Sequence, residues 1–162
     1  MMKNKPTYLL LFVLLTLLSC KQSQTTDTDT NQNASTPPKA AVSYPALDNQ
    51  TITQLYAMTD KADIIFYDMP ISVNQDDAKA AKNSVLYISP SPAVINNTCK
   101  ALGRLTFISD GAIIKEADIY SDSLCHYFIF IENNKPVAAN AMEQSGISFF
   151  KTIIDQVQQK QQ

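Results

Sequence analysis

Hydrophobic and polar positions divide the chain into an apolar leader, a polar segment and a longer mixed region. Residues 8–18 are almost all apolar, whereas residues 21–42 contain hardly any side chain that could be buried. From Tyr44 to Gln158, apolar residues recur at the two spacings that distinguish helices from strands. The pattern therefore predicts a single globular domain over residues 44–162, preceded by two segments of a different kind.

Three stretches of the mixed region have helical patterns. Residues 51–61 begin with a capping box and continue with apolar residues at helical spacing. Residues 75–82 place acidic residues first and lysines last, the order that suits the helix dipole. Ser145 is a suitable N-cap for a third helix, which has one apolar stripe. The stripe consists of Phe149, Phe150, Ile153, Ile154 and Val157.

Other stretches are typical of strands. Residues 63–69 and 85–89 are mostly apolar, and each is followed by a proline that ends the strand. Residues 125–132 are a longer apolar stretch, and Asn133-Asn134 can turn the chain after it because asparagine tolerates left-handed conformations. Residues 136–142 follow, and their leading proline favours an edge strand since it lacks a donor for the ladder.

The clearest local signal is a hairpin at Asp110-Gly111, flanked by residues 104–109 and 112–120. A two-residue turn would pair Phe107 with Ile114, and Ile108 with Ile113. Successive strands joined by tight turns form an antiparallel meander, and helices from both ends of the domain would cover one face of it. The predicted fold class is therefore α+β, an antiparallel β-meander sheet with N-terminal and C-terminal helices packed on one face.

The first twenty residues consist of a basic start, an apolar stretch and a final cysteine. Lys3 and Lys5 make the start basic, and the apolar stretch that follows is shorter than the roughly twenty residues of a spanning helix. Leu17-Leu18-Ser19-Cys20 resembles the lipobox of bacterial lipoproteins, in which a small residue precedes the cysteine that receives lipid. The resemblance implies a signal peptide at residues 1–19 and a palmitate-type lipid on Cys20. A secretory signal with an incidental cysteine and an uncleaved anchor are the alternatives.

Residues 20–43 would then be the lipidated cysteine and a disordered tether. This segment has too few apolar residues to offset the entropy of ordering, and a flexible linker of such length spans about 25 Å. Lys21 follows the cysteine in place of aspartate, which by resemblance to enteric sorting rules favours the outer membrane. We expect a protein of the cell envelope, anchored to the membrane by lipid on the periplasmic or surface side.

The chain has three cysteines, and lipid on Cys20 would leave Cys99 and Cys125 as a pair in an oxidising compartment. A disulfide between them would close a loop of about 27 residues, which the chain-entropy model values at about 3.5 kcal/mol. Two separate buried thiols or a redox pair are the alternatives, although the spacing is not the Cys-x-x-Cys of thioredoxin-like proteins.

Residues that could carry chemistry are few. His126 is the only histidine, and a zinc site needs several histidine or cysteine ligands, so no metal is expected. Glu116 and Asp118 lie two apart on a predicted strand and share one face, with Asp122 nearby. Paired carboxylates can act in acid–base catalysis, but acidic residues are also expected wherever a strand face is exposed to solvent. The common phosphate-binding, dinucleotide and nucleophile motifs are absent, so we predict no catalytic residues and no cofactor.

Net charge bears on the class of partner. It is −2 for the whole chain and becomes −4 when Lys3 and Lys5 leave with the leader, which gives no electrostatic basis for binding nucleic acid.

The sequence favours a non-catalytic envelope lipoprotein that binds an envelope protein partner. A second hypothesis is a small-ligand binder, and a third is an unfamiliar enzyme that uses Glu116 and Asp118. A ligand groove could be lined by the aromatic residues Tyr120, Tyr127, Phe128 and Phe130, which otherwise pack in the core.

Overall fold

The computed structural model describes residues 43–160, so the predicted signal peptide, Cys20 and nearly all of the tether lie outside the described residues. The helices of the described part are α1 (Asn49–Met58), α2 (Ala78–Val85) and α3 (Gln144–Gln159). Its strands are β1 (Lys61–Phe66), β2 (Ser72–Gln75), β3 (Ile88–Pro92), β4 (Gly103–Ser109), β5 (Ala112–Ser121), β6 (His126–Glu132) and β7 (Lys135–Met142). None of the helices in this range has the length and hydrophobicity needed to span a membrane.

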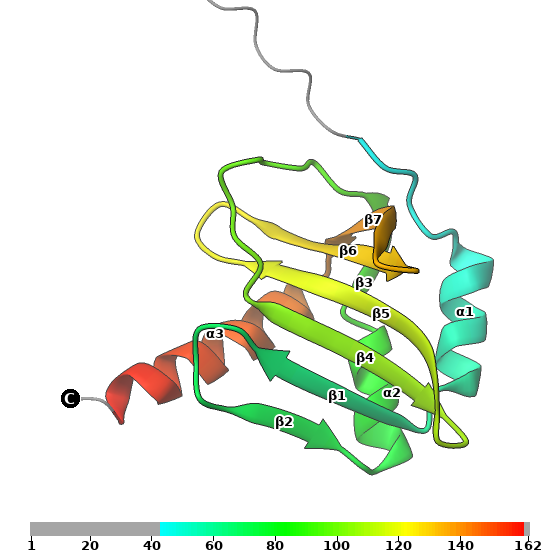
Figure 1. The fold of residues 1–162 in the computed structure, drawn as a ribbon, viewed down its shortest axis with the longest axis horizontal. Helices are drawn as coiled ribbons and strands as arrows, with labels where there is room; N and C mark the ends of the chain where they lie inside the picture. Colours follow the sequence, from blue (N-terminus) through cyan, green and yellow to red (C-terminus); the bar gives the residue numbers. More distant parts are fainter. Residues whose placement is uncertain (1–42, 161–162) are drawn as a thin grey trace, which may run out of the picture. The chain divides into compact units, whose positions relative to one another are not determined.

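The strands form one antiparallel sheet in the order β2-β1-β4-β5-β6-β7-β3 (Figure 1). Strands β4 to β7 are consecutive neighbours, which confirms the predicted meander. Its first turn has positive φ angles at Asp110 (51°) and Gly111 (80°), and a later turn has them at Asn133 (51°) and Asn134 (60°). Asparagine, aspartate and glycine tolerate such angles, so both turns occur at residues suited to them, and both turns join strands that are neighbours in the sheet. The α+β prediction is confirmed.

All three described helices pack on one face of the sheet, with α2 and α3 behind the strands in Figure 1. Leu55 of α1, Val85 of α2 and Phe150 of α3 belong to one buried cluster with the strands. The strand residues of that cluster are Ala62, Ile64, Phe66, Ile88, Leu105, Phe107, Ala117, Ile119, Phe128, Phe130, Ala138 and Met142. The alternation of these residues along β1, β4, β5 and β6 therefore directs one set of side chains toward the helices.

The opposite face of the sheet is only partly covered. A second, smaller cluster contains Tyr127 and Ile129, and it is packed against Tyr44 and the loop of residues 93–102. Over β1, β4 and the middle of β5, side chains of this face remain accessible, and Ile65 is 58% exposed there. The sheet thus has one face covered by helices, and another that a loop covers at one end only.

Two strand predictions need correction. Strand β7 is not an edge strand, since it pairs with both β6 and β3. The pairs between β7 and β3 involve only Asn140 and Met142 of β7, so no strand pairs with β7 on that side at Pro136. The missing N–H of Pro136 therefore costs no hydrogen bond between strands. The edge positions belong to β2, which the sequence pattern did not indicate, and to β3. Strand β3 also runs through Pro92 instead of ending before its first proline, because an edge strand tolerates proline.

The helix starts also differ from prediction by a few residues. Asp48, not Thr51, caps α1, and its carboxylate accepts a hydrogen bond from the Thr51 N–H at 2.7 Å. Asp77 caps α2 through the Ala80 N–H, so the predicted start at residue 75 was too early. Helix α3 starts at Gln144 after Glu143, which makes no side-chain cap hydrogen bond, so Ser145 is inside the helix. Aspartate competes strongly for the N-cap, which explains the first two shifts.

Candidate functional site

The predicted acidic pair lies on the partly covered face, where both carboxylates meet Arg104. Its Nε and Nη2 atoms donate hydrogen bonds to Oδ1 of Asp118 at 3.0 and 2.9 Å. Its Nη1 atom is 3.8 Å from Oε1 of Glu116. The hydroxyl of Tyr67 donates to the same Asp118 oxygen at 2.8 Å. Glu116 and Asp118 are therefore brought together as expected, but around a cation that the sequence did not single out.

This cluster is ordered by strand register. Arg104 on β4 and Asp118 on β5 are direct cross-strand partners, and Ile65 on β1 is the partner of Arg104 on its other side. Partial burial, the hydrogen bond to Asp118 and the negative charge of that carboxylate all raise the pKa of Tyr67 above its usual value. The phenol therefore remains a hydrogen-bond donor at neutral pH. The carboxylates serve as partners of Arg104 and Tyr67, and this geometry alone does not supply a general acid–base pair.

Apolar side chains border the charged cluster. Ile65 is 58% exposed and Tyr67 is 49% exposed. A second row of cross-strand partners joins Asp63, Thr106 and Glu116 next to the first. We call this surface the open face. It consists of Asp63, Ile65, Tyr67, Arg104, Thr106, Glu116 and Asp118.

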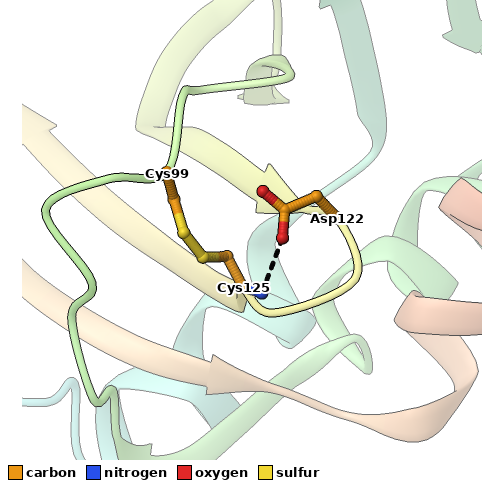
Figure 2. A group of neighbouring side chains, drawn as sticks. All are labelled: Cys99, Asp122 and Cys125. Atoms are coloured by element: carbon orange, nitrogen blue, oxygen red, sulfur yellow. Dashed lines mark hydrogen bonds between the residues drawn. A yellow bond between two sulfur atoms is a disulfide. The ribbon is translucent and has the colours of Figure 1, made fainter.

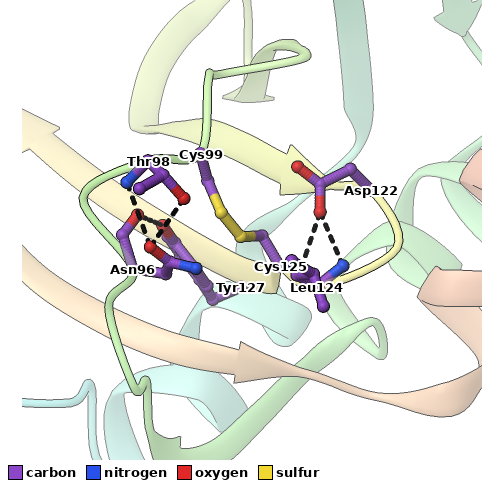
Figure 3. Close-up of a disulfide and its surroundings, with 7 residues drawn as sticks. All are labelled: Asn96, Thr98, Cys99, Asp122, Leu124, Cys125 and Tyr127. Atoms are coloured by element: carbon purple, nitrogen blue, oxygen red, sulfur yellow. Dashed lines mark hydrogen bonds between the residues drawn. A yellow bond between two sulfur atoms is a disulfide. The ribbon is translucent and has the colours of Figure 1, made fainter.

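Cys99 and Cys125 form a disulfide, as the sequence predicted. Cys99 lies in the 93–102 loop and Cys125 directly precedes β6, so the bond joins this loop to the sheet (Figures 2 and 3). Asp122 closes the turn before Cys125 by accepting hydrogen bonds from the N–H groups of Leu124 (2.7 Å) and Cys125 (2.8 Å). Chain-entropy reasoning gives such a bond about 3.5 kcal/mol of stabilisation.

The loop end of the disulfide is also held by side chains (Figure 3). Oδ1 of Asn96 accepts from the backbone N–H and the hydroxyl of Thr98 at 3.0 and 2.8 Å. The Tyr127 hydroxyl donates to the backbone oxygen of Asn96 at 3.2 Å, and the Tyr127 ring stacks on Tyr120 with centroids 4.6 Å apart. The loop is therefore fastened to an aromatic pair on the sheet as well as through Cys99.

Sulfur and carboxylate atoms come close together at the disulfide. Ligand atoms of Cys99, Asp122 and Cys125 all lie within 4.8 Å of one another (Figure 2). Zinc and similar metals bind the thiolate form of cysteine, which a disulfide does not offer. One Asp122 oxygen also accepts the two N–H groups of the turn. With Cys99 and Cys125 joined in a disulfide, these three residues therefore form a structural link between the 93–102 loop and the turn at Asp122–Cys125.

The remaining sequence candidates do not share one site. Tyr120 and Tyr127 face the 93–102 loop, whereas Phe128 and Phe130 are fully buried on the helix side. The four aromatics thus divide between two faces, as alternation along neighbouring strands requires, and they do not line a common groove. His126 is the cross-strand partner of Ser121 at the end of the sheet, away from Glu116 and Asp118.

Sequence reasoning missed three residues that shape these surfaces. Arg104 and Tyr67 complete the charged cluster, and Asn140 is a fully buried polar residue of β7. The only sequence signal for Arg104 was its place in the Asp110-Gly111 hairpin opposite the acidic strand. Tyr67 bonds to a residue 51 positions away, and no local pattern encodes that separation.

Comparisons of the chain with protein-family models, with curated proteins and with solved structures find no match. What the protein does is therefore inferred from its own residues, beginning with the open face.

Proposed function

We propose that this protein is a non-catalytic lipoprotein of the cell envelope, and that its domain binds a protein partner through the open face. The observation that carries the proposal is the accessible half of the sheet, where Ile65 and Tyr67 border the Arg104–Asp118 pair. Tyrosine and arginine are enriched at the centres of protein interfaces, with apolar area around them. The open face has this composition.

The order within the cluster favours binding. Asp118 holds both Tyr67 and Arg104 through hydrogen bonds of 2.8 to 3.0 Å. Side chains that are already immobilised lose little conformational entropy when a partner arrives. The open face also contains three acidic residues, with Asp63 and Glu116 beside Asp118, against one arginine. Lys61, on the same side of β1, is paired with Asp76 at 3.5 Å. The charge of the open face therefore suits a partner surface that combines apolar residues with lysine or arginine.

The membrane part of the proposal rests on the lipobox resemblance at Cys20. We expect mass spectrometry of the mature protein to find residues 1–19 removed and fatty acyl chains on Cys20. We expect Cys20→Ala to keep the leader and lose the acyl mass, because the cysteine is the site of attachment. An unmodified Cys20 in the mature protein would refute lipid anchoring, although it would leave partner binding at the open face untested by that result alone.

Partner binding is tested by introducing a charge into the apolar border of the open face. Ile65→Asp, in the full-length protein expressed in its own bacterium, is expected to reduce capture of a cross-linked envelope partner by at least tenfold. The physical reason is that a desolvated carboxylate would join a surface that is already acidic. Quantitative mass spectrometry of the cross-linked complexes is the measurement.

Leu86→Asp is the matched control for this experiment. Leu86 is 53% exposed, close to the exposure of Ile65, but it follows α2 and lies outside the open face. We expect this variant to capture the partner as the wild type does. Equal capture by Ile65→Asp and wild type would show that the partner binds elsewhere, and enrichment of no envelope protein by the wild type would reject the proposed function.

A further inference from the structure

A cavity of about 430 Å³ lies on the helix-covered side, between α3 and the ends of β5 and β6. Ser121, Ser123 and His126 line its strand side. Ile147 and Ile154 of α3 line its other side, so its walls are largely apolar with a few polar groups. Cavities of roughly 300–1,000 Å³ with this character are typical of sites for small molecules.

Two neighbouring polar side chains of the cavity have unused hydrogen-bonding capacity. Ser121 and His126 are direct cross-strand partners, which places their side chains next to each other on one face. Ser121 is only 8% exposed, and Nδ1 of His126 is buried without a hydrogen-bond partner in residues 43–160. Buried polar groups in folded proteins are normally satisfied. The Ser121–His126 pair is thus a point where a ligand's hydroxyl or amide can bind, once the imidazole ring turns Nδ1 toward the cavity.

Two charged residues, Asp122 and Lys151, also line the cavity, and each already has a partner within the protein. The Lys151 ammonium donates to Asp155 at 2.8 Å, one turn along α3. The Asp122 carboxylate accepts the N–H groups of Leu124 and Cys125. A ligand of either charge would be repelled by one wall residue, an anion by Asp122 and a cation by Lys151. The polar groups that remain free are therefore neutral, which favours an uncharged ligand.

From this geometry we infer that the cavity binds a small, uncharged amphipathic molecule. Its hydroxyl or amide group hydrogen-bonds to Ser121 and His126, and its aliphatic or aromatic body packs against Ile147 and Ile154. The cavity is on the helix-covered side of the sheet and the open face is on the other. Ligand binding is consequently independent of the partner binding proposed above, and either one can fail without the other.

Two probes of equal size but different charge test the inference. 4-Fluorobenzyl alcohol and 4-fluorobenzoate are titrated into the full-length protein in lipid nanodiscs at pH 8, with empty nanodiscs as the blank. Binding is followed by fluorine NMR of the probe and by the methyl signals of Ile147 and Ile154. We expect the alcohol to shift both methyl signals and to bind at least fivefold more tightly than the benzoate. The carboxylate is repelled by Asp122, and the one cation of the lining, Lys151, is already paired with Asp155.

Three variants then locate the binding site. Ser121→Ala should weaken binding of the alcohol by at least threefold, since it removes one hydrogen-bonding partner. Ile154→Trp should weaken binding by at least tenfold, because the larger ring would occupy the part of the cavity next to this wall, where the body of the ligand packs. Ile153→Trp is the matched control, because Ile153 is the neighbouring isoleucine on α3 and lies outside this cavity. Thermal unfolding checks that each variant is folded. Equal binding of alcohol and benzoate, no binding of the alcohol, or equal effects of the two tryptophan variants would overturn the inference.

Discussion

The variant Asn140→Leu is expected to destabilise the domain by about 4 kcal/mol. Asn140 is fully buried, and its amide nitrogen donates to the backbone oxygens of Leu47 (3.0 Å) and Ser89 (2.9 Å). Its amide oxygen accepts from the Leu47 N–H at 2.8 Å. Leucine has a similar size but no hydrogen-bonding group, so three backbone groups from two other segments would lose their partner. Each such loss costs roughly 1–3 kcal/mol.

Urea unfolding monitored by circular dichroism, with the disulfide intact, measures this effect. The control is Asn74→Leu, because Asn74 is an exposed residue of β2. Surface substitutions of this kind change stability by only about 0.5 kcal/mol. If Asn140→Leu lost no more stability than Asn74→Leu, the role assigned to the buried amide would be wrong.

A comparable loss, about 4 kcal/mol, is expected for Phe150→Ala. Phe150 is the only large side chain of α3 that is fully buried. Its ring packs edge-on to Phe128 and Tyr87, with centroids 6.3 and 6.2 Å away. Removing the ring would leave a cavity in the main core and free α3 from the sheet. Chemical unfolding measures the stability, and amide hydrogen exchange in α3 should become faster than in the strands.

Phe149→Ala is the matched control. The neighbouring ring stacks on Tyr87 at 5.1 Å but is only partly buried. Its removal should cost about half as much, since less apolar area leaves water on folding. Equal losses for the two variants would mean that α3 is not anchored mainly through Phe150.

The hairpin illustrates how far local signals predict the site. The Asp110-Gly111 turn and the pairing of Ile108 with Ile113 were predicted correctly, because turn chemistry determines both. Beyond them, a register shift pairs Phe107 with Lys115, so the predicted Phe107–Ile114 pair was wrong. Without this shift, Arg104 would lie opposite Ala117 instead of Asp118.

The shift is a β-bulge, and its consequence is large because side chains alternate between faces. One extra residue on β5 directs Ala117 into the core and aligns Asp118 with Arg104. No turn or propensity rule revealed it. The core had to favour one register over another, and that choice depends on contacts with strands and helices far away in sequence.

The other features divide into those that local patterns encode and those that depend on distant segments. Fold class and the Cys99–Cys125 bond followed from patterning and from counting cysteines, which need no long-range geometry. Strand β2 is four residues long and pairs only with β1, so its pattern was too short to recognise. Asn140 bonds to a residue 93 positions away, and nothing in the surrounding sequence distinguishes it from an exposed asparagine.

The attachment of the chain to β7 determines how the domain would respond to force. The Ala139 N–H donates to the Pro45 oxygen at 2.8 Å, and the Asn140 amide bonds to both backbone groups of Leu47. Tension applied to the chain before Ser43 would reach these hydrogen bonds before it reached α1 or the core. These contacts would thus act as a mechanical clamp where the chain enters the domain, and the Asn140 side chain supplies two of the three hydrogen bonds.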